Sequence, residues 1–296
     1  MSYLNNKLVS TKGGLLTRVF SGSCLILLLL SPKLYAAEFE HSYSQYETLL
    51  KEVVKVSEDK KQTRVDYQRL AIDPQSLVTV LSLFSGVTQA QYDSWDTEQQ
   101  LSFLINAYNG FTLQLIADNW SEFTLGKASS IRDLGSLFTS PWEKKFFTLF
   151  GKQHNLDDIE HQMIRKWFKE PRIHAALVCA AVSCPPLRVE AFVADNLEQQ
   201  LDSQMKLFLA DNSRNEIIVN GPLGRASLSS IFKWYQGDFE KGEGGFTSLY
   251  DVLNKYSAAL VQDDENPQAQ LSLLKQGDFP ILFKDYDWRL NDVANF

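Results

Sequence analysis

Residues 97–120 read TEQQLSFLINAYNGFTLQLIADNW, and this stretch is apolar on most faces of a helix. A helix that is hydrophobic all round is buried inside a protein. We therefore expect a central helix that the other elements surround. Thr97 and Gln100 have the spacing of a capping box, which predicts where this helix begins.

Ser102, Asn106 and Asn109 form a polar stripe on this otherwise apolar helix, at spacings of four and seven residues. Buried amides must find hydrogen-bond partners. In one interpretation they hold the backbone of neighbouring loops. In the other, Asn106 or Asn109 faces a site, where it orients a histidine or donates to an oxyanion.

Shorter elements are expected on both sides of the central helix. Apolar residues recur at helical spacing in residues 43–53, 197–208 and 246–260. Two apolar runs, Phe146–Phe150 and Glu216–Val219, are each followed by a turn signal and then by a helical pattern. Each predicts a hairpin that leads into a capped helix, near Asn155 and near Ser227.

Residues 281–288 predict one more strand. The fold class is therefore α+β, mostly helical, with a small antiparallel sheet. We find no Pro-, Ser- or Gly-rich linker, so residues 37–296 are expected to form a single globular domain.

The first 36 residues have the three parts of a secretory signal peptide. Basic residues come first, an apolar segment from Val19 to Leu30 follows, and small residues then precede a cut after Ala36 or Ala37. The apolar segment is shorter than the roughly 20 residues that a membrane-spanning helix needs. The sequence therefore predicts export to the periplasm or the exterior, with no stable membrane span after cleavage.

Export would also change the charge of the protein. The first 36 residues hold four basic and no acidic residues, so their removal changes the formal net charge from -7 to -11. An acidic chain without a basic tract is poorly suited to bind nucleic acid. The ligands that remain are a small molecule, a peptide or a glycan, and the sequence predicts no cofactor.

Residues 171–187 read PRIHAALVCAAVSCPPL and carry the most reactive side chains of the chain. His174 lies near one end and Cys184 near the other, where Pro185 and Pro186 end any regular element. A histidine can lower the pKa of a thiol and take its proton. In one straight helix the two would be about 15 Å apart, so their meeting requires a bend.

Other interpretations of this segment compete with a catalytic Cys184. Cleavage after Ala36 removes Cys24 and leaves Cys179 and Cys184 as a pair, which an oxidising compartment favours as a disulfide. That disulfide requires the regular element to end before Cys184. Cys179 is alternatively a packed core residue, and His174 a hydrogen-bonded core histidine.

Glu160 falls on the apolar face of the helix predicted after Asn155, where a carboxylate needs a partner. Arg172 or Arg132 would supply one in a structural ion-pair network. A metal site from His154, Glu160, His161 and His174 is a further alternative, although their spacing fits no common zinc pattern.

Aromatic residues also gather with acids in Trp234-Tyr235, Asp238-Phe239 and Tyr286-Asp287-Trp288. Such clusters are typical of core and rim packing. A groove for a carbohydrate or peptide, lined by these rings, is the alternative.

Several of these motifs occur together in a known order. They are Leu104-Ile105-Asn106-Ala107-Tyr108-Asn109, Leu156-Asp157-Asp158-Ile159-Glu160-His161, Arg172-Ile173-His174 through Cys184-Pro185-Pro186-Leu187, and Ile231-Phe232-Lys233-Trp234-Tyr235 with Asp238-Phe239. Together, over about residues 90–240, they resemble the domain-of-unknown-function family 547. Leu104 and Ala175 depart from the residues expected there, and neither is a reactive group.

The resemblance implies an uncharacterised domain that occurs in exported bacterial proteins and inside plant cells, and it implies no reaction. A cysteine segment shared with proteins of reducing compartments argues against a purely structural disulfide.

Two hypotheses for function follow. The first is a thiol-dependent hydrolase or transferase for an extracytoplasmic amide, peptide or ester. In it Cys184 is the nucleophile, His174 the base, and Asn106, Asn109 or Glu160 an orienting or polarising group. The second is a non-catalytic binding module with a Cys179–Cys184 disulfide.

Overall fold

A computed structural model describes residues 38–220, 223–264 and 267–295 of the chain. The predicted signal peptide and its cleavage site lie outside the described residues. From Phe39 onward the described chain forms one compact unit.

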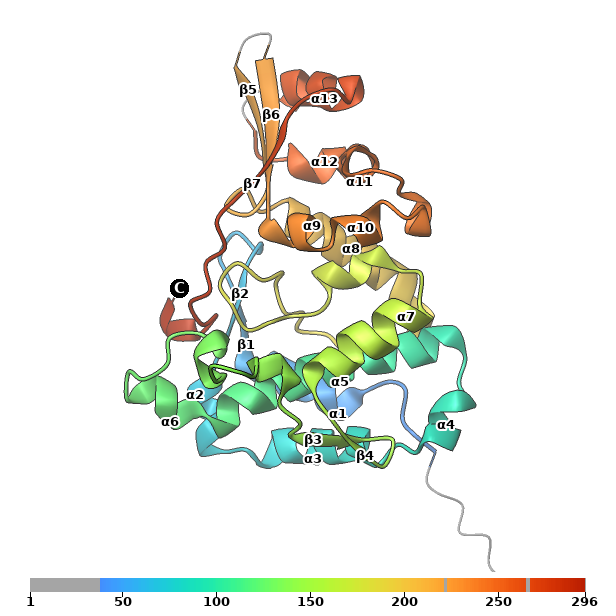
Figure 1. Ribbon diagram of the computed structural model, residues 1–296, viewed down its shortest axis with the longest axis vertical. Helices are drawn as coiled ribbons and strands as arrows, with labels where there is room; N and C mark the ends of the chain where they lie inside the picture. The colour runs from blue at the N-terminus through green and yellow to red at the C-terminus, as the bar shows by residue number, and fades with distance from the viewer. Residues whose placement is uncertain (1–37, 221–222, 265–266, 296) are drawn as a thin grey trace, which may run out of the picture. The chain divides into compact units, whose positions relative to one another are not determined.

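Most helices of this unit are short, and short strands lie between them (Figure 1). The α-helices are α1 (Ser44–Val53), α2 (Tyr67–Ile72), α3 (Gln75–Ser85), α4 (Gln89–Asp93), α5 (Thr97–Asp118), α6 (Trp120–Thr124), α7 (Arg165–Trp167), α8 (Leu197–Leu209), α9 (Ser230–Trp234), α10 (Gln236–Phe239), α11 (Leu249–Lys255), α12 (Ser257–Leu260) and α13 (Pro267–Gln276). The strands are β1 (Val54–Val56), β2 (Thr63–Val65), β3 (Phe147–Leu149), β4 (Lys152–His154), β5 (Glu216–Asn220), β6 (Leu223–Leu228) and β7 (Ile281–Phe283).

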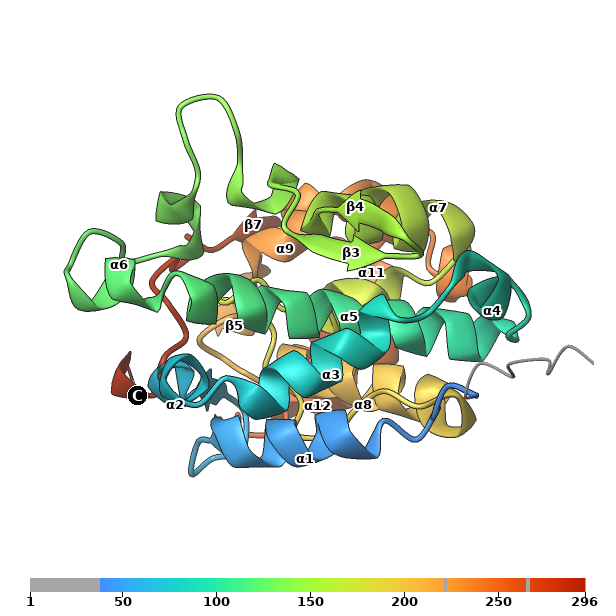
Figure 2. The same ribbon diagram turned by 90° about the horizontal axis from the view of Figure 1, so that it is seen from below.

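Helix α5 is the central helix that the sequence predicts. Its residues from Leu101 to Leu113 are all buried. Figure 2 shows α1 and α3 on one side of α5, and the β3–β4 hairpin with α7 on the other. The capping box lies one residue before the predicted pair, because Asp96 is still extended and its side chain accepts the Gln99 N–H. The Gln100 side chain donates instead to the Tyr92 carbonyl.

Both predicted hairpins are present. Strands β3 and β4 pair antiparallel, and so do β5 and β6. The second helix begins at Ser230 and not near Ser227, because Ser227 and Leu228 still belong to β6 and pair with β7. Strand β7 is shorter than predicted and joins β6 in parallel. The fold is therefore α+β and mostly helical, with small sheets that are mainly antiparallel.

Two hydrophobic clusters form the core. The larger one, which we call the α5 cluster, contains Leu104, Phe111 and Leu156. The smaller one, the sheet cluster, packs β5 and β6 against α8, α9 and α11 and contains Ile217 and Phe232. Because such packing removes apolar side chains from water, these two clusters supply most of the stabilising free energy.

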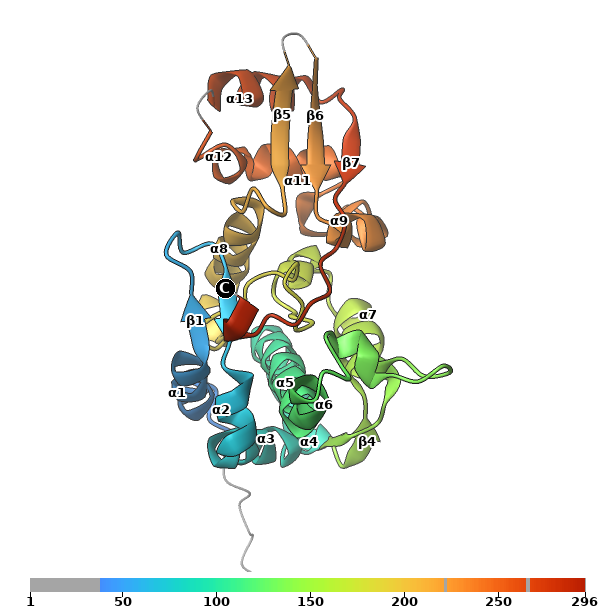
Figure 3. The same cartoon turned by 90° about the vertical axis from the view of Figure 1, so that its left-hand side faces the viewer.

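The C-terminal strap, residues 281–292, joins the two clusters. In Figure 3 it leaves β7 beside the sheet and runs down toward β1 and α2. Leu290 pairs with Ala181, and Asp292 pairs with Val65. Tyr286, in the middle of the strap, packs against both clusters.

Among the described residues, no helix has the length and apolar character that crossing a membrane requires.

Candidate functional site

A pocket of about 240 Å³ opens where the two clusters meet. Residues of six separate segments line it: α5, the turn that holds Trp142, the helix around Glu160, residues 171–187, α9 with the residue after it, and the strap. Its lining consists of Tyr108, Trp142, Asp157, Glu160, His161, His174, Leu177, Cys179, Cys184, Ile231, Trp234, Tyr235, Tyr286 and Trp288. His174, Cys184 and Glu160, which the sequence singles out, thus share one cavity.

Residues 171–187 reach the pocket because their regular structure ends early. A 3-10 helix covers only Pro171–Ala175, and an irregular segment that we call the cysteine loop, residues 176–187, follows it. Ala180 has a φ of 59°, a left-handed conformation that is unfavourable for residues other than glycine. This turn lies between the two cysteines and folds them back toward each other.

Cys179 and Cys184 are joined in a disulfide, and their Cα atoms are 6.1 Å apart, a normal separation for such a bond. Cys184 is buried, and Cys179 is partly exposed. Two donors surround the sulfur of Cys184: the Cys179 N–H at 2.9 Å and the Tyr286 hydroxyl at 3.2 Å. The Tyr286 oxygen is also 3.2 Å from the Cys179 sulfur.

His174 is held by Asp238, whose Oδ2 lies 2.9 Å from the Nε2 of the ring. Asp238 also accepts from Arg165 Nε at 2.6 Å and from Lys241 Nζ at 2.7 Å. Burial alone would raise the pKa of Asp238, but the three hydrogen bonds outweigh burial and hold that pKa far below its ordinary value.

An ionised carboxylate can only accept, so Nε2 of His174 carries the ring proton and Nδ1 keeps a lone pair. Burial lowers the pKa of His174, against the hydrogen bond to Asp238, which would raise it. The ring also stacks on Tyr235, with centroids 3.7 Å apart. The lowered pKa favours the neutral imidazole, and Asp238 and Tyr235 fix the orientation of the ring.

Glu160 lies in a π-helical turn, Asp158–Ile164, a geometry that is frequent at functional sites. Its Oε1 accepts from the Tyr235 hydroxyl at 2.6 Å. Burial, and next the charge of Glu160, raise the pKa of Tyr108, to which Glu160 is also hydrogen-bonded. The carboxyl group of Glu160 thus connects α5 to the residue that follows α9.

The predicted arginine partners of Glu160 are wrong, because both arginines are engaged elsewhere. Arg172 donates from Nε to Glu170 Oε1 and from Nη1 to Glu198 Oε1, both at 2.8 Å. Arg132 lies over the Trp288 ring, 5.0 Å from its centroid.

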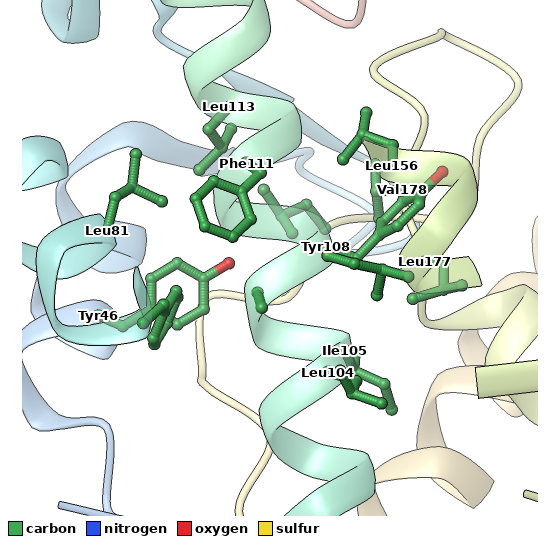
Figure 4. Packing of buried hydrophobic residues seen from close by; sticks show 14 of the residues in the cluster. Tyr46, Leu81, Leu104, Ile105, Tyr108, Phe111, Leu113, Leu156, Leu177 and Val178 are labelled. Carbon is green, nitrogen blue, oxygen red and sulfur yellow. The ribbon is translucent and has the colours of Figure 1, made fainter. Parts of the chain in front are cut away.

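Asn106 and Asn109 bind backbone and do not line the pocket. Asn109 donates to the Ala176 carbonyl and accepts the Val178 N–H, both at 2.9 Å. Asn106 makes the same pair of bonds with Phe192, at 2.7 and 3.0 Å. Asn109 therefore clamps the start of the cysteine loop to α5, between His174 and Cys179. Figure 4 shows Tyr108 of α5 beside Leu177 and Val178 of that loop.

Of the four residues of the metal alternative, Glu160, His161 and His174 line the pocket and His154 does not. His154 pairs with Asp158 at 2.9 Å and does not line the pocket. His161 lies 2.9 Å from Arg165 Nη1 and 3.6 Å from Asp157. Within the part of the chain that the structure describes, no group of three or more His, Cys, Asp and Glu side chains is placed to hold a metal ion.

Sequence reasoning missed Asp238, Tyr235 and Tyr286 as partners of the reactive groups. It noted the aromatic and acidic clusters that contain them but favoured core packing. An acid three residues after Tyr235 on an apolar helix was the available signal, since such an acid needs a partner. Nothing local indicates that this partner is His174, 64 residues away.

A comparison with known protein families covers three of the four motifs quoted above, and the motif at residues 231–239 lies beyond the match. Residues 92–209 match the family described as "Protein of unknown function, DUF547". No curated protein and no solved structure matches the chain. The matched residues include Glu160, His174 and both pocket cysteines, whereas Asp238, Tyr286 and Trp288 lie beyond them. Over residues 92–209 this chain therefore carries the domain of the DUF547 family, whose function is unknown.

Proposed function

We propose that this protein is an exported thiol-dependent hydrolase or transferase that acts on an amide, a peptide or an ester. The observation that carries the proposal is that Cys184 and the His174–Asp238 pair line the same pocket. A thiol, a neutral histidine and a carboxylate that orients the histidine are the parts of a cysteine nucleophile system.

The chemistry begins from the reduced form, in which Cys184 is a thiol. Nδ1 of His174 takes its proton, and Asp238 stabilises the resulting imidazolium. The Cys179 N–H and the Tyr286 hydroxyl, which are directed at the sulfur, stabilise the thiolate. The thiolate then attacks the carbonyl carbon, and His174 returns the proton to the leaving amine or alcohol. Water or an acceptor nucleophile cleaves the thioester and restores the thiol.

The disulfide withholds Cys184 from this reaction. A dithiol reductant must first transfer two electrons to the disulfide, which leaves Cys179 and Cys184 as thiols. Cys179 is the more exposed of the two, so we expect an incoming thiolate to attack its sulfur and release Cys184.

The test is the rate at which an iodoacetamide probe alkylates single-cysteine variants. Cys179→Ser leaves Cys184 free, and we expect it to react at neutral pH without reductant. In the chain that begins at Ala37, which lacks Cys24, Cys184→Ser leaves only Cys179 and should react at the rate of an ordinary thiol. In the Cys179→Ser background, His174→Asn or Asp238→Asn should slow the alkylation of Cys184.

The chain offers a matched control for the last pair of variants. His154 and Asp158 form a second histidine–aspartate pair, also 2.9 Å apart, that does not line the pocket. His154→Asn and Asp158→Asn should leave the alkylation rate unchanged. Equal rates for Cys184 and Cys179, or rates that do not depend on His174, would contradict the proposal.

The disulfide itself favours a second candidate, a non-catalytic binding module in which Cys179–Cys184 is a structural staple. The loop that it closes is short, with a sequence separation of 5. By loop entropy such a staple contributes about 2 kcal/mol, which corresponds to about 4–8 °C in Tm for a chain of this size. If reduction lowers Tm by that amount and no thiol of enhanced reactivity appears, the staple is the better explanation.

A further inference from the structure

One wall of the pocket is aromatic. Trp234 and Trp288 stack with centroids 5.6 Å apart, and Tyr286 lies 4.7 Å from the first and 4.6 Å from the second. Trp142 meets the Trp288 ring edge-on at 6.1 Å. These rings come from three separate segments, so the fold, and not a local sequence run, gathers them. Trp234 is 47% exposed and is thus open to a ligand.

The floor of the pocket is acidic. Asp157 and Glu160 contribute carboxyl groups, whereas no lysine or arginine is among the described residues that line the cavity. Burial raises the pKa of Asp157, against the charge of His161, which would lower it. A cation in the pocket would be attracted by these two carboxyl groups.

Two guanidinium groups contact aromatic rings that line the pocket. Arg132 lies over Trp288 at 5.0 Å, and Arg165 lies over Tyr235 at 5.2 Å. Arg165 is already bound to Asp238 and faces His161. The negative faces of aromatic rings attract cations, and these contacts show that rings of this pocket do so.

We propose that the group that enters this pocket is an organic cation, an alkylammonium or quaternary ammonium carried by the substrate. The inference builds on the proposed function, because it names the substrate class of the same pocket. Aromatic rings around a carboxylate form the cage that recognises such cations. A neutral sugar carries no charge for these rings and carboxyl groups to attract, so it is the alternative ligand in the experiment.

The experiment compares choline with 3,3-dimethyl-1-butanol, its neutral isostere, by calorimetry and by quenching of tryptophan fluorescence. Residues 37–296 are used with the disulfide intact, so that binding is measured without any thiol chemistry. We expect choline to bind at least tenfold more tightly, the order of a desolvated cation–π contact. N-acetylglucosamine serves as the neutral sugar.

Two variants and a control assign the binding to the pocket. Trp234→Ala and Glu160→Gln should each reduce choline affinity several-fold, and Glu160→Gln should also reduce the preference over the isostere. Trp167→Ala is the matched control, because Trp167 is 50% exposed and does not line the pocket. This variant should leave the choline affinity unchanged.

Three outcomes would overturn the inference: choline fails to bind, the isostere or the sugar binds equally well, or Trp234→Ala and Trp167→Ala behave alike. If Trp234→Ala does not fold, the choline and isostere comparison in the unmodified protein decides. The alkylation rates of Cys184 are independent of this experiment. A reactive thiol without cation preference therefore rejects only the substrate class, and cation binding without a reactive thiol rejects only the enzymatic proposal.

Discussion

Hydrogen bonds hold the side chains of His174 and Glu160 in place. The two ring nitrogens of His174 are made unequal by Asp238, and the carboxyl of Glu160 is satisfied by tyrosine hydroxyls. A buried polar group without a partner costs more free energy than a satisfied one contributes. The loss of stability caused by a substitution here should therefore depend on whether it leaves a buried polar group without its hydrogen-bond partner.

Tyr235→Phe removes the hydroxyl that donates to Glu160 and leaves the buried carboxyl with one partner fewer. We expect the free energy of unfolding to fall by about 1–3 kcal/mol, as measured by urea denaturation. Tyr46→Phe is the control, since the Tyr46 hydroxyl is buried with no hydrogen-bond partner among the described residues. That variant should be neutral or slightly more stable, and equal losses in the two variants would contradict the role given to Glu160.

The lowered pKa of His174 makes stability depend on pH. Below about pH 6.5, the ordinary pKa of histidine, the unfolded chain binds a proton at this ring that the folded chain does not. The stability that belongs to the neutral ring is thus fully present above pH 6.5 and is lost as the pH falls below it. The urea midpoint should decrease from pH 7 to pH 5, and His174→Asn should flatten this slope. An unchanged slope would show that His174 does not cause it.

At the scale of elements, α5 positions the cysteine loop although it contributes only Tyr108 to the pocket. Asn109 clamps the loop at Ala176 and Val178, and Asn106 clamps the chain at Phe192. Both side chains form hydrogen bonds with backbone groups that have no partner within a helix or a sheet. These two asparagines of the polar stripe thus bind two irregular segments, at Ala176 to Val178 and at Phe192, to α5.

Asn109→Ala leaves a buried carbonyl and a buried N–H without partners. We expect a loss of about 3 kcal/mol in unfolding free energy and faster hydrogen exchange at Val178. Asn106→Ala is the matched control, because it breaks the same two kinds of bond at Phe192. It should speed exchange at Phe192 and leave Val178 protected. Exchange that rises equally at both places in both variants would argue against separate clamps.

At the scale of the whole molecule, the C-terminal strap completes the pocket. Val182 donates to the Arg289 carbonyl, Ser183 to the Asp287 carbonyl, and Asn291 to the Ala180 carbonyl. The strap therefore lies along the cysteine loop and brings Tyr286 to both sulfurs. The residues that match the DUF547 family end at Leu209, so the strap adds to that domain Tyr286 and Trp288, two rings of the aromatic wall that we assign to substrate binding.

The predicted export is tested on the whole chain. If the first 36 residues are a cleaved signal, the protein isolated from the periplasm or medium should begin at Ala37, or at Glu38 for the alternative cut. Intact mass measurement decides between these ends. A cytosolic protein that keeps Met1 or Ser2 at its N-terminus would contradict export and would favour free thiols at Cys179 and Cys184.

Local patterns were enough for the central helix and the two hairpins, because hydrophobic periodicity and turn chemistry act over a few residues. They also singled out His174, Cys184 and Glu160, which line one pocket. Only the tertiary structure decided what those residues face. Asp238 meets His174 across 64 residues, Tyr235 meets Glu160 across 75, and Tyr286 meets Cys184 across 102. Such contacts depend on how the two clusters and the strap pack together, and no local pattern encodes that arrangement.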